Sequence, residues 1–284
     1  MVRGSNVSFS PRTAAHDHVD STPIPAVPQP RSLALVETPQ SNRARDPFAS
    51  TANPASYVPR TATEGALVRL EMALREDRPC VSLSGPDGAG KTLLLHILAH
   101  RLDGDFHSLY IPYPKLSPDG FCQWTLAALG APRALHPEEA LHGRIASDAA
   151  AGFPPLLIMV DDAAHMPADT LRCLSGLQED SAGFLRVLVV RSEEIPLALF
   201  AAEGLDPVDV ELEGHMGRDE MARYIRTRLD RAVVDGSLRA RLEGAIEELH
   251  ARTGGNPARL HAAAAEILSR SPELQRHQGI GTGH

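Results

Sequence analysis

Residues 85–92 read Gly-Pro-Asp-Gly-Ala-Gly-Lys-Thr, and this segment constrains the fold more than any other part of the chain. It matches the pattern G-x-x-x-x-G-K-T, in which the backbone N–H groups of a glycine-rich loop surround phosphate groups. The pattern carries weight only between a strand and a helix, and the flanking sequence predicts both, at 80–84 and at 91–102. The helix N-terminus adds its dipole to such an anion site. The segment therefore predicts a nucleotide-binding α/β fold.

The lysine of this loop, Lys91, is one of only two lysines among the 28 basic residues of the chain. A slim ammonium on a flexible stem reaches between phosphate oxygens, whereas a planar guanidinium is bulkier. We expect Lys91 to contribute to catalysis as well as to binding, and Thr92 to offer its hydroxyl to Mg²⁺. The residues predicted to bind the phosphates of ATP are Gly85, Pro86, Asp87, Gly88, Ala89, Gly90, Lys91 and Thr92.

A pair of acidic residues, Asp161-Asp162, directly follows the apolar run 156–160. Such a run suits a central parallel strand that is buried on both faces, and strand ends in an open α/β sheet point at the ligand crevice. We therefore expect Asp161 to hold Mg²⁺ together with Thr92, mainly through water. Asp162 is expected to orient or polarise the attacking water, which makes it a catalytic candidate beside Lys91.

Strand and helix patterns alternate along the middle of the chain. Apolar strands are expected at 80–84, 108–111, 156–160, 185–190 and 208–212, with helices at 63–76, 91–102, 117–130 and 137–150. This alternation predicts an α/β doubly wound parallel sheet with right-handed crossovers. Beyond residue 214 only helices are expected, at 217–233, 237–252 and 256–269.

These patterns divide the chain into four parts. Residues 1–45 are rich in Pro, Ser and Thr without sustained periodicity, which predicts a disordered tail. Residues 46–213 are expected to form the α/β nucleotide-binding core and residues 214–270 a small helical unit. Residues 271–284 are expected to be a flexible C-terminus.

Composition limits the class of protein. The chain is 43% hydrophobic and 23% charged, as is typical of a globular protein, and no segment approaches the roughly 18 apolar residues of a membrane helix. The N-terminus has no apolar signal core, so we expect a cytoplasmic protein. The three cysteines fit no metal-ligand spacing and are expected to be buried.

The net charge of −8 at pH 7 argues against broad binding to a phosphate backbone. Residues 218–241 are an exception, because they carry seven arginines against four acids. This segment is either a solvated helical face or a surface for nucleic acid or a partner.

Two further segments are candidates for sensing the γ-phosphate. The strand at 185–190 ends in Arg191-Ser192, and either side chain is a candidate sensor. Arg259, at the start of the last expected helix, is expected to reach back to the phosphates of the nucleotide. Each has a structural alternative as a surface charge or a helix cap.

Together these residues resemble the AAA+ ATPases of the ExeA/GspA type, from type II secretion and MSHA-type pilus systems, and more distantly the TniB/TnsC-type transposition ATPases. The likeness runs from about Pro47 to Leu268. It is carried by the segment 110–118, by Val160-Asp161-Asp162, and by Gly254-Gly255-Asn256-Pro257. The resemblance implies a AAA+ P-loop core followed by a C-terminal helical lid, with ATP and Mg²⁺ as cofactors and a homo-oligomeric assembly.

The sequence departs from that family in three places. Asp162 stands where the family usually has a glutamate, which is one methylene longer. The segment 201–207 has no arginine, although the family tends to place candidate arginine fingers there, and Arg259 lies one place later than the usual Pro-Arg. Because water positioning is sensitive to distance, these differences predict slow hydrolysis.

The first hypothesis is an ATP-binding AAA+ protein whose nucleotide state controls the assembly of a secretion, pilus or envelope machine, with slow hydrolysis to ADP and phosphate. The alternatives are a DNA-associated, transposition-type regulator and a nucleotide-gated scaffold with little turnover. The arginines of 218–241 favour DNA, whereas the acidic body and the segment 112–118 favour a protein partner. The partner machine and the oligomer size are left open.

Overall fold

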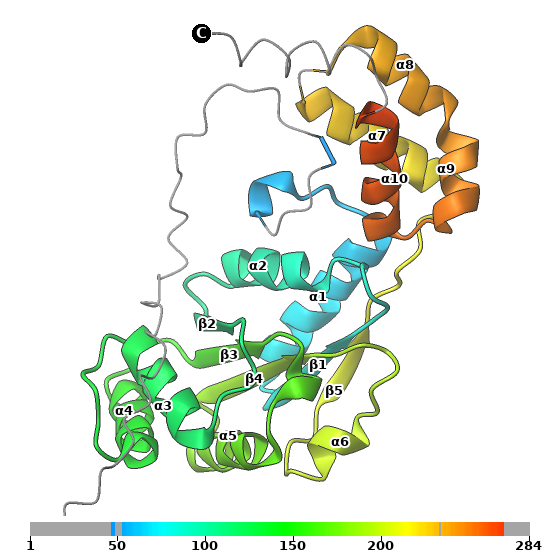
Figure 1. Cartoon of the computed structure of the whole chain (residues 1–284). Coiled ribbons are helices and arrows are strands. Elements are labelled where there is room, and N and C mark those ends of the chain that lie inside the picture. Colours follow the sequence, from blue (N-terminus) through cyan, green and yellow to red (C-terminus); the bar gives the residue numbers. More distant parts are fainter. Residues whose placement is uncertain (1–46, 49–52, 233, 270–284) are drawn as a thin grey trace, which may run out of the picture.

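The computed structural model describes residues 47–48, 53–232 and 234–269 (Figure 1). The expected N-terminal tail, 1–45, and the expected flexible end, 271–284, lie outside the described residues. Within the described ranges, no helix combines the length and the apolar character needed to cross a membrane.

Five parallel strands form one sheet in the order β2-β3-β4-β1-β5. All five predicted strands are confirmed to within one residue at either end. Because the strands are parallel, their carboxyl ends meet at one edge, where ligands bind in open α/β sheets. The bounds are Cys80–Ser84 for β1, His107–Ile111 for β2, Leu156–Val160 for β3, Leu185–Val190 for β4 and Val208–Glu211 for β5.

Helices cover both faces of this sheet, as predicted for a doubly wound fold (Figure 1). One face packs against α1, Thr61–Arg75, and α2, Lys91–Arg101. The other face packs against three helices, α3 (Pro118–Ala128), α4 (Pro137–Ala150) and α5 (Ala168–Asp180).

The side chains of β4 show why both faces need cover. Val187 and Val189 point into the core beside α3 to α5, whereas Leu188 and Val190 point into the core beneath α1 and α2. Successive residues of a strand face opposite sides of a sheet, and full burial of each such side chain contributes roughly 1.5–3 kcal/mol. The apolar run 187–190 therefore contributes to two cores at once.

Two helices were not predicted. One is α5, although its buried residues Leu171, Leu174 and Leu177 recur every three positions, which is a helical spacing. The other is α6, Ala198–Ala201, a single turn that is too short to show a period. Two short 3₁₀ helices complete the sheet region, η1 at Pro54–Ser56 and η2 at Ala163–His165.

Within the described residues, the C-terminal part contains four helices, which we call the helical bundle. They are α7 (Arg218–Arg231), α8 (Gly236–Gly244), α9 (Ile246–Thr253) and α10 (Pro257–Ser269). The expected single helix over 237–252 is wrong, because the chain breaks between α8 and α9 at Ala245. Gly244, a poor helix former, precedes the break, and the bend lets Leu242 and Leu249 both enter the core of the bundle.

The core of the helical bundle includes residues from the beginning of the described chain. Phe48 and Val58 are buried among Met221, Ile225 and Leu260. Phe48 also makes an edge-on contact with the ring of His261, with 5.8 Å between ring centroids. The segment that leads into α1 therefore packs with the bundle, although more than 150 residues separate the two in sequence.

Two adjacent glycines before α10 allow a test of this packing. Both have a left-handed backbone, with φ of +58° at Gly254 and +78° at Gly255. A Cβ at Gly254 would meet nothing within 4 Å, whereas one at Gly255 would lie 2.1 Å from the carbonyl oxygen of Met216.

We expect Gly254→Ala to lower the free energy of unfolding by about 1–2 kcal/mol, the cost of left-handed backbone in a non-glycine residue. Gly255→Ala should cost about 1–3 kcal/mol more, because it adds overpacking against backbone. Urea denaturation of both variants measures the difference, and equal losses would contradict the close approach of Met216.

Candidate functional site

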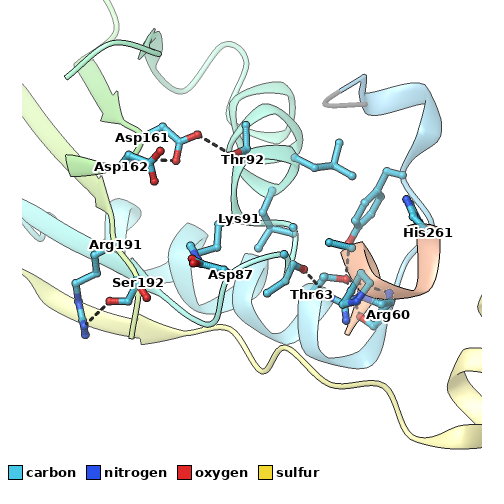
Figure 2. A pocket seen from close by; sticks show the side chains of 18 of the residues that line it. Arg60, Thr63, Asp87, Lys91, Thr92, Asp161, Asp162, Arg191, Ser192 and His261 are labelled. Atoms are coloured by element: carbon cyan, nitrogen blue, oxygen red, sulfur yellow. Dashed lines mark hydrogen bonds and ion pairs between the residues drawn. The ribbon is translucent and has the colours of Figure 1, made fainter. Parts of the chain in front are cut away.

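A cavity of about 770 Å³ lies at the carboxyl edge of the sheet, between the loop 85–90 and the helical bundle. Its walls include the segment before α1, the first turn of α1, residues 87–90 of the loop, the start of α2, the residues after β3 and β4, and helices α7 and α10. Figure 2 shows these side chains converging from elements that are far apart in the sequence. Because the phosphate loop and the acids after β3 both line this cavity, it is the candidate site.

The loop between β1 and α2 has the conformation that its glycines permit. Gly88 and Gly90 have φ of +78° and +101°, which side-chain-bearing residues rarely adopt. Gly90 is the N-cap of α2, and no atom lies within 4 Å of the position that a Cβ would take there. This open space at a helix N-terminus fits a phosphate group, because the free N–H groups of α2 point toward it.

Lys91 spans the loop from the first turn of α2. Its Nζ donates hydrogen bonds to the carbonyl oxygens of Gly85, at 2.7 Å, and Pro86, at 3.1 Å, and lies 3.8 Å from Asp87 Oδ1. Burial lowers the pKa of Lys91, and the nearby carboxylates of Asp87 and Asp161 oppose that shift. The ammonium is therefore positioned at the loop before any ligand binds.

Thr92 and Asp161 meet although 69 positions separate them. Thr92 Oγ1 donates a hydrogen bond to Asp161 Oδ2 at 2.7 Å, and Tyr110 OH donates to the same oxygen at 3.1 Å. The other oxygen of Asp161 accepts from the backbone N–H of Asp162 at 3.0 Å. A hydroxyl and a carboxylate in contact are the protein ligands that Mg²⁺ takes when phosphates and water supply the rest. The described residues hold no group of three or more His, Cys, Asp or Glu side chains that could bind a metal ion.

Asp162 occupies an unusual position next to this pair. Its backbone is left-handed, with φ of 47° and ψ of 42°, and its side chain is exposed. Asp tolerates this conformation better than most residues, and strained backbone of this kind clusters at functional sites. The side chain borders both the main cavity and a smaller one of about 250 Å³, which Tyr113, Lys115 and His165 also line.

Arg191 and Ser192 both reach the cavity, but their surroundings differ. The buried guanidinium of Arg191 donates to Ser82 Oγ at 3.1 Å, to Asp209 Oδ2 at 2.8 Å and to the carbonyl of Ile195 at 2.5 Å. It is therefore occupied in tying the end of β4 to β1 and β5. Ser192 is left as the side chain of this pair that is available to a ligand.

The helical bundle bonds directly to the loop at the start of α10. Asn256 Nδ2 donates to the carbonyl of Asp87 at 2.9 Å, and the N–H of Ala258 donates to the carbonyl of Gly88 at 3.3 Å. Ala258 lines the cavity, whereas Arg259 is exposed and does not. Successive helical residues point about 100° apart, so the structure does not bring Arg259 to the phosphate end where the sequence analysis placed it.

The far end of the cavity is lined by residues that the sequence analysis did not single out. In the bundle, Tyr224 OH accepts hydrogen bonds from Arg228 Nε at 3.2 Å and Nη2 at 2.9 Å, and lies 2.8 Å from His261 Nε2. Burial, assisted by Arg228, lowers the pKa of His261 to about 4. His261 is thus neutral near pH 7 and accepts the hydrogen of the Tyr224 hydroxyl.

Tyr57, Val58 and Arg60 close the same end from the segment before α1. Arg60 is the N-cap residue of α1, a position where Ser, Thr, Asp and Asn are preferred. An arginine where a helix starts is unusual, and this is the signal in the sequence that could have pointed to this end of the cavity. The remaining contacts depend on how the bundle folds back over the sheet.

Comparisons with known proteins agree with this architecture. Residues 74–208 match the protein-family model of a AAA domain. Cdc6p from Pyrobaculum aerophilum has a similar structure, with a TM-score of 0.58 and 18% identity over 80% of this chain and 66% of its own. The Walker-type ATPase PABY2304 of Pyrococcus abyssi gives a TM-score of 0.57 and 16% identity, over 82% of this chain and 74% of its own.

The Orc1 protein of Aeropyrum pernix, solved in complex with DNA, is similar as well, with a TM-score of 0.56 and 16% identity over 81% of this chain and 66% of its own. This chain spans just under two thirds of the Cdc6p and Orc1 chains. No curated protein sequence matches it. The match of residues 74–208 and the shared fold, together with the loop 85–92 and the acids that end β3, show that this chain has the P-loop AAA+ fold.

Proposed function

We propose that the cavity binds ATP with Mg²⁺ and that the chain acts as a nucleotide-dependent switch with slow hydrolysis. The observation that carries this proposal is the hydrogen bond of Thr92 to Asp161, 2.7 Å long, beside Lys91 at the N-terminus of α2. A magnesium-binding pair and a phosphate-binding loop thereby adjoin each other.

Each residue of the phosphate end has a role in this proposal. The N–H groups of the loop and Lys91 hold the phosphate oxygens, and Thr92 and Asp161 hold the Mg²⁺. Bound Mg²⁺ would neutralise charge that develops on the phosphates. Asp162 orients the water that attacks the γ-phosphate, and its exposed carboxylate forms no hydrogen bond or ion pair with the described residues.

We expect slow turnover because of the length of Asp162, the position of Arg259 and the lack of arginine in 201–207. The Asp162 side chain is one methylene shorter than the glutamate that the ExeA/GspA resemblance implies, and Arg259 does not line the cavity. The segment 201–207 supplies no arginine to a neighbouring subunit. The residues for ATP binding are therefore all present, whereas those for fast ATP hydrolysis are not.

The hydrogen bonds of Asn256 and Ala258 to the loop would couple nucleotide binding to the helical bundle. Phosphate binding that moves the carbonyls of Asp87 or Gly88 moves the start of α10 with them. A change of this kind would alter the surface that the helical bundle presents in a homo-oligomer or to a protein partner. The proposal of a partner in a secretion, pilus or envelope assembly rests on the ExeA/GspA resemblance alone. The comparisons with known proteins do not show that type.

DNA is the second candidate partner, and the Orc1 structure in complex with DNA favours it. The arginines of 218–241 favour it less than the sequence suggested, because five of the seven already bond within the chain. The other two, Arg223 and Arg226, are exposed. The five arginines that bond within the chain pair as follows: Arg218 with Glu247, Arg228 with Tyr224, Arg231 with Tyr57, Arg239 with Asp230 and Arg241 with Ile267.

Lys91→Ala tests the binding site. It removes charge-assisted hydrogen bonds to phosphate worth roughly 1.5–3 kcal/mol each, so we expect ATP affinity to fall about a hundredfold or more. Calorimetric titration with Mg²⁺-ATP measures the loss, and Arg259→Ala serves as the control that should bind like the unaltered chain. Tight ATP binding by Lys91→Ala would remove the basis of the proposed function.

Asp162→Glu tests whether reach limits hydrolysis. The added methylene brings the carboxylate closer to the attacking water, so we expect the turnover number to rise severalfold while ATP affinity stays unchanged. Phosphate release at saturating ATP gives the rate, with Asp162→Asn as an inactive comparison that tolerates the same backbone. A rate that is equal or lower in Asp162→Glu would exclude the length of the side chain as the cause.

Duplex DNA separates the two candidate partners. Because most of the arginines in 218–241 are occupied, we expect duplex DNA at physiological salt to leave the ATPase rate within about twofold. Phosphate release is measured with and without DNA. Clear stimulation would move the assignment to a DNA-associated regulator.

A further inference from the structure

Tyr110, near the carboxyl end of β2, reaches the carboxylate of Asp161 with its hydroxyl. The hydroxyl donates to Asp161 Oδ2 at 3.1 Å, the same oxygen that accepts from Thr92 Oγ1 at 2.7 Å. Asp161 is itself buried, with 8% of the residue exposed. Figure 2 shows the bond from Thr92, which belongs to α2, whereas Tyr110 belongs to β2. Two elements therefore hold the same carboxylate oxygen.

The hydrogen bonds to Asp161 are divided unequally between its two oxygens. An ionised carboxylate accepts through about four lone-pair sites, two on each oxygen. Oδ2 accepts from both Thr92 and Tyr110, whereas Oδ1 accepts from the backbone N–H of Asp162 at 3.0 Å. Among the described residues, these are the donors that reach the carboxylate. The lone-pair site that is left for a ligand therefore lies on Oδ1.

The ring of Tyr110 is fixed by packing. Tyr110 pairs with Met159 in the parallel register of β2 and β3, and its ring packs against the core beneath α1 and α2. His96 lies against the ring, with 4.7 Å between ring centroids. Because residues four apart share a face of a helix, Thr92 and His96 both face this end of β2 from α2. The same helix thus supplies the second donor to Asp161 and the ring that confines Tyr110.

We propose that Tyr110 is a positioning residue for the bound metal: with Thr92 it holds Asp161 Oδ2 and so presents Oδ1 to Mg²⁺ or to a water of its shell. This inference rests on the proposed function, since it takes Asp161 to hold Mg²⁺ beside the phosphates. Mg²⁺ demands near-ideal octahedral geometry, so a carboxylate that can turn about its Cβ–Cγ bond binds it less well. Removing a hydrogen bond that orients a metal ligand typically lowers metal affinity by about 10–100-fold.

ATP affinity with and without Mg²⁺ tests the proposal. Tyr110→Phe keeps the ring and removes the hydroxyl. The ratio of ATP affinity at saturating Mg²⁺ to ATP affinity in EDTA measures what the metal contributes in the site, and calorimetric titration gives both values. We expect Tyr110→Phe to lower this ratio about tenfold. ATP affinity in EDTA should stay unchanged, because the loop 85–92 binds the phosphates without Asp161.

Tyr113→Phe is the matched control. It removes the hydroxyl of a tyrosine that follows β2 and is 66% exposed. Its ratio of the two ATP affinities should equal that of the unaltered chain.

Ca²⁺ separates positioning from a general loss of packing. Ca²⁺ takes about six to eight oxygen ligands in flexible geometry, so it depends less on the direction of one carboxylate. With Ca²⁺ in place of Mg²⁺, we expect the ratio of ATP affinities to change less than about twofold in Tyr110→Phe. The preference of the site for Mg²⁺ over Ca²⁺ should therefore fall.

Three results would overturn the proposal: an unchanged Mg²⁺ ratio in Tyr110→Phe, an equal loss of ATP affinity in EDTA, or an equal fall of the Mg²⁺ and Ca²⁺ ratios. The second and third are what a merely structural role of Tyr110 would give. Failure of the proposed function is distinct, since it would appear as unimpaired ATP binding in Lys91→Ala.

Discussion

The site depends on one short hydrogen bond, from the first turn of α2 to the end of β3. Thr92 and Asp161 come within 2.7 Å only because β4 pairs with both β1 and β3, which brings the loop after β1 and the acids after β3 to the same edge. Parallel strands that are buried on both faces need apolar side chains throughout. The loop after β1 and the acids after β3 therefore supply the polar groups of this pair.

The second constraint is the contact of the helical bundle with the phosphate loop. Asn256 uses its amide nitrogen for the carbonyl of Asp87 and its amide oxygen for the N–H of Arg259, so one side chain caps α10 and holds it to the loop. Gly88 lies under Ala258, where an added Cβ would come within 2.6 Å of the alanine side chain. The glycine serves the approach of the bundle as well as the approach of a phosphate.

Most of the sheet region could be predicted because its elements carry local signals. The strands were short apolar runs, and Ser117 and Pro118, the N-cap and first residue of α3, are residue types that favour a helix start. The bundle was harder. A break such as that at Ala245 lowers the energy only once Leu242 and Leu249 can pack into one core, and no local pattern records that. Arg259 shows the same limit at the scale of one residue, because helix phase decides whether a side chain faces the cavity.

The sequence by itself determined the phosphate loop, the strand that precedes it and the acidic pair after β3, since glycine backbone freedom and strand burial act over a few neighbouring residues. Only the tertiary structure decided that Arg191 is occupied by Ser82 and Asp209, that Ala258 rather than Arg259 meets the loop, and that Tyr110 donates to Asp161. Whether a buried charge or hydrogen-bond donor has a partner depends on groups from distant parts of the sequence. Only the tertiary fold brings those groups next to it.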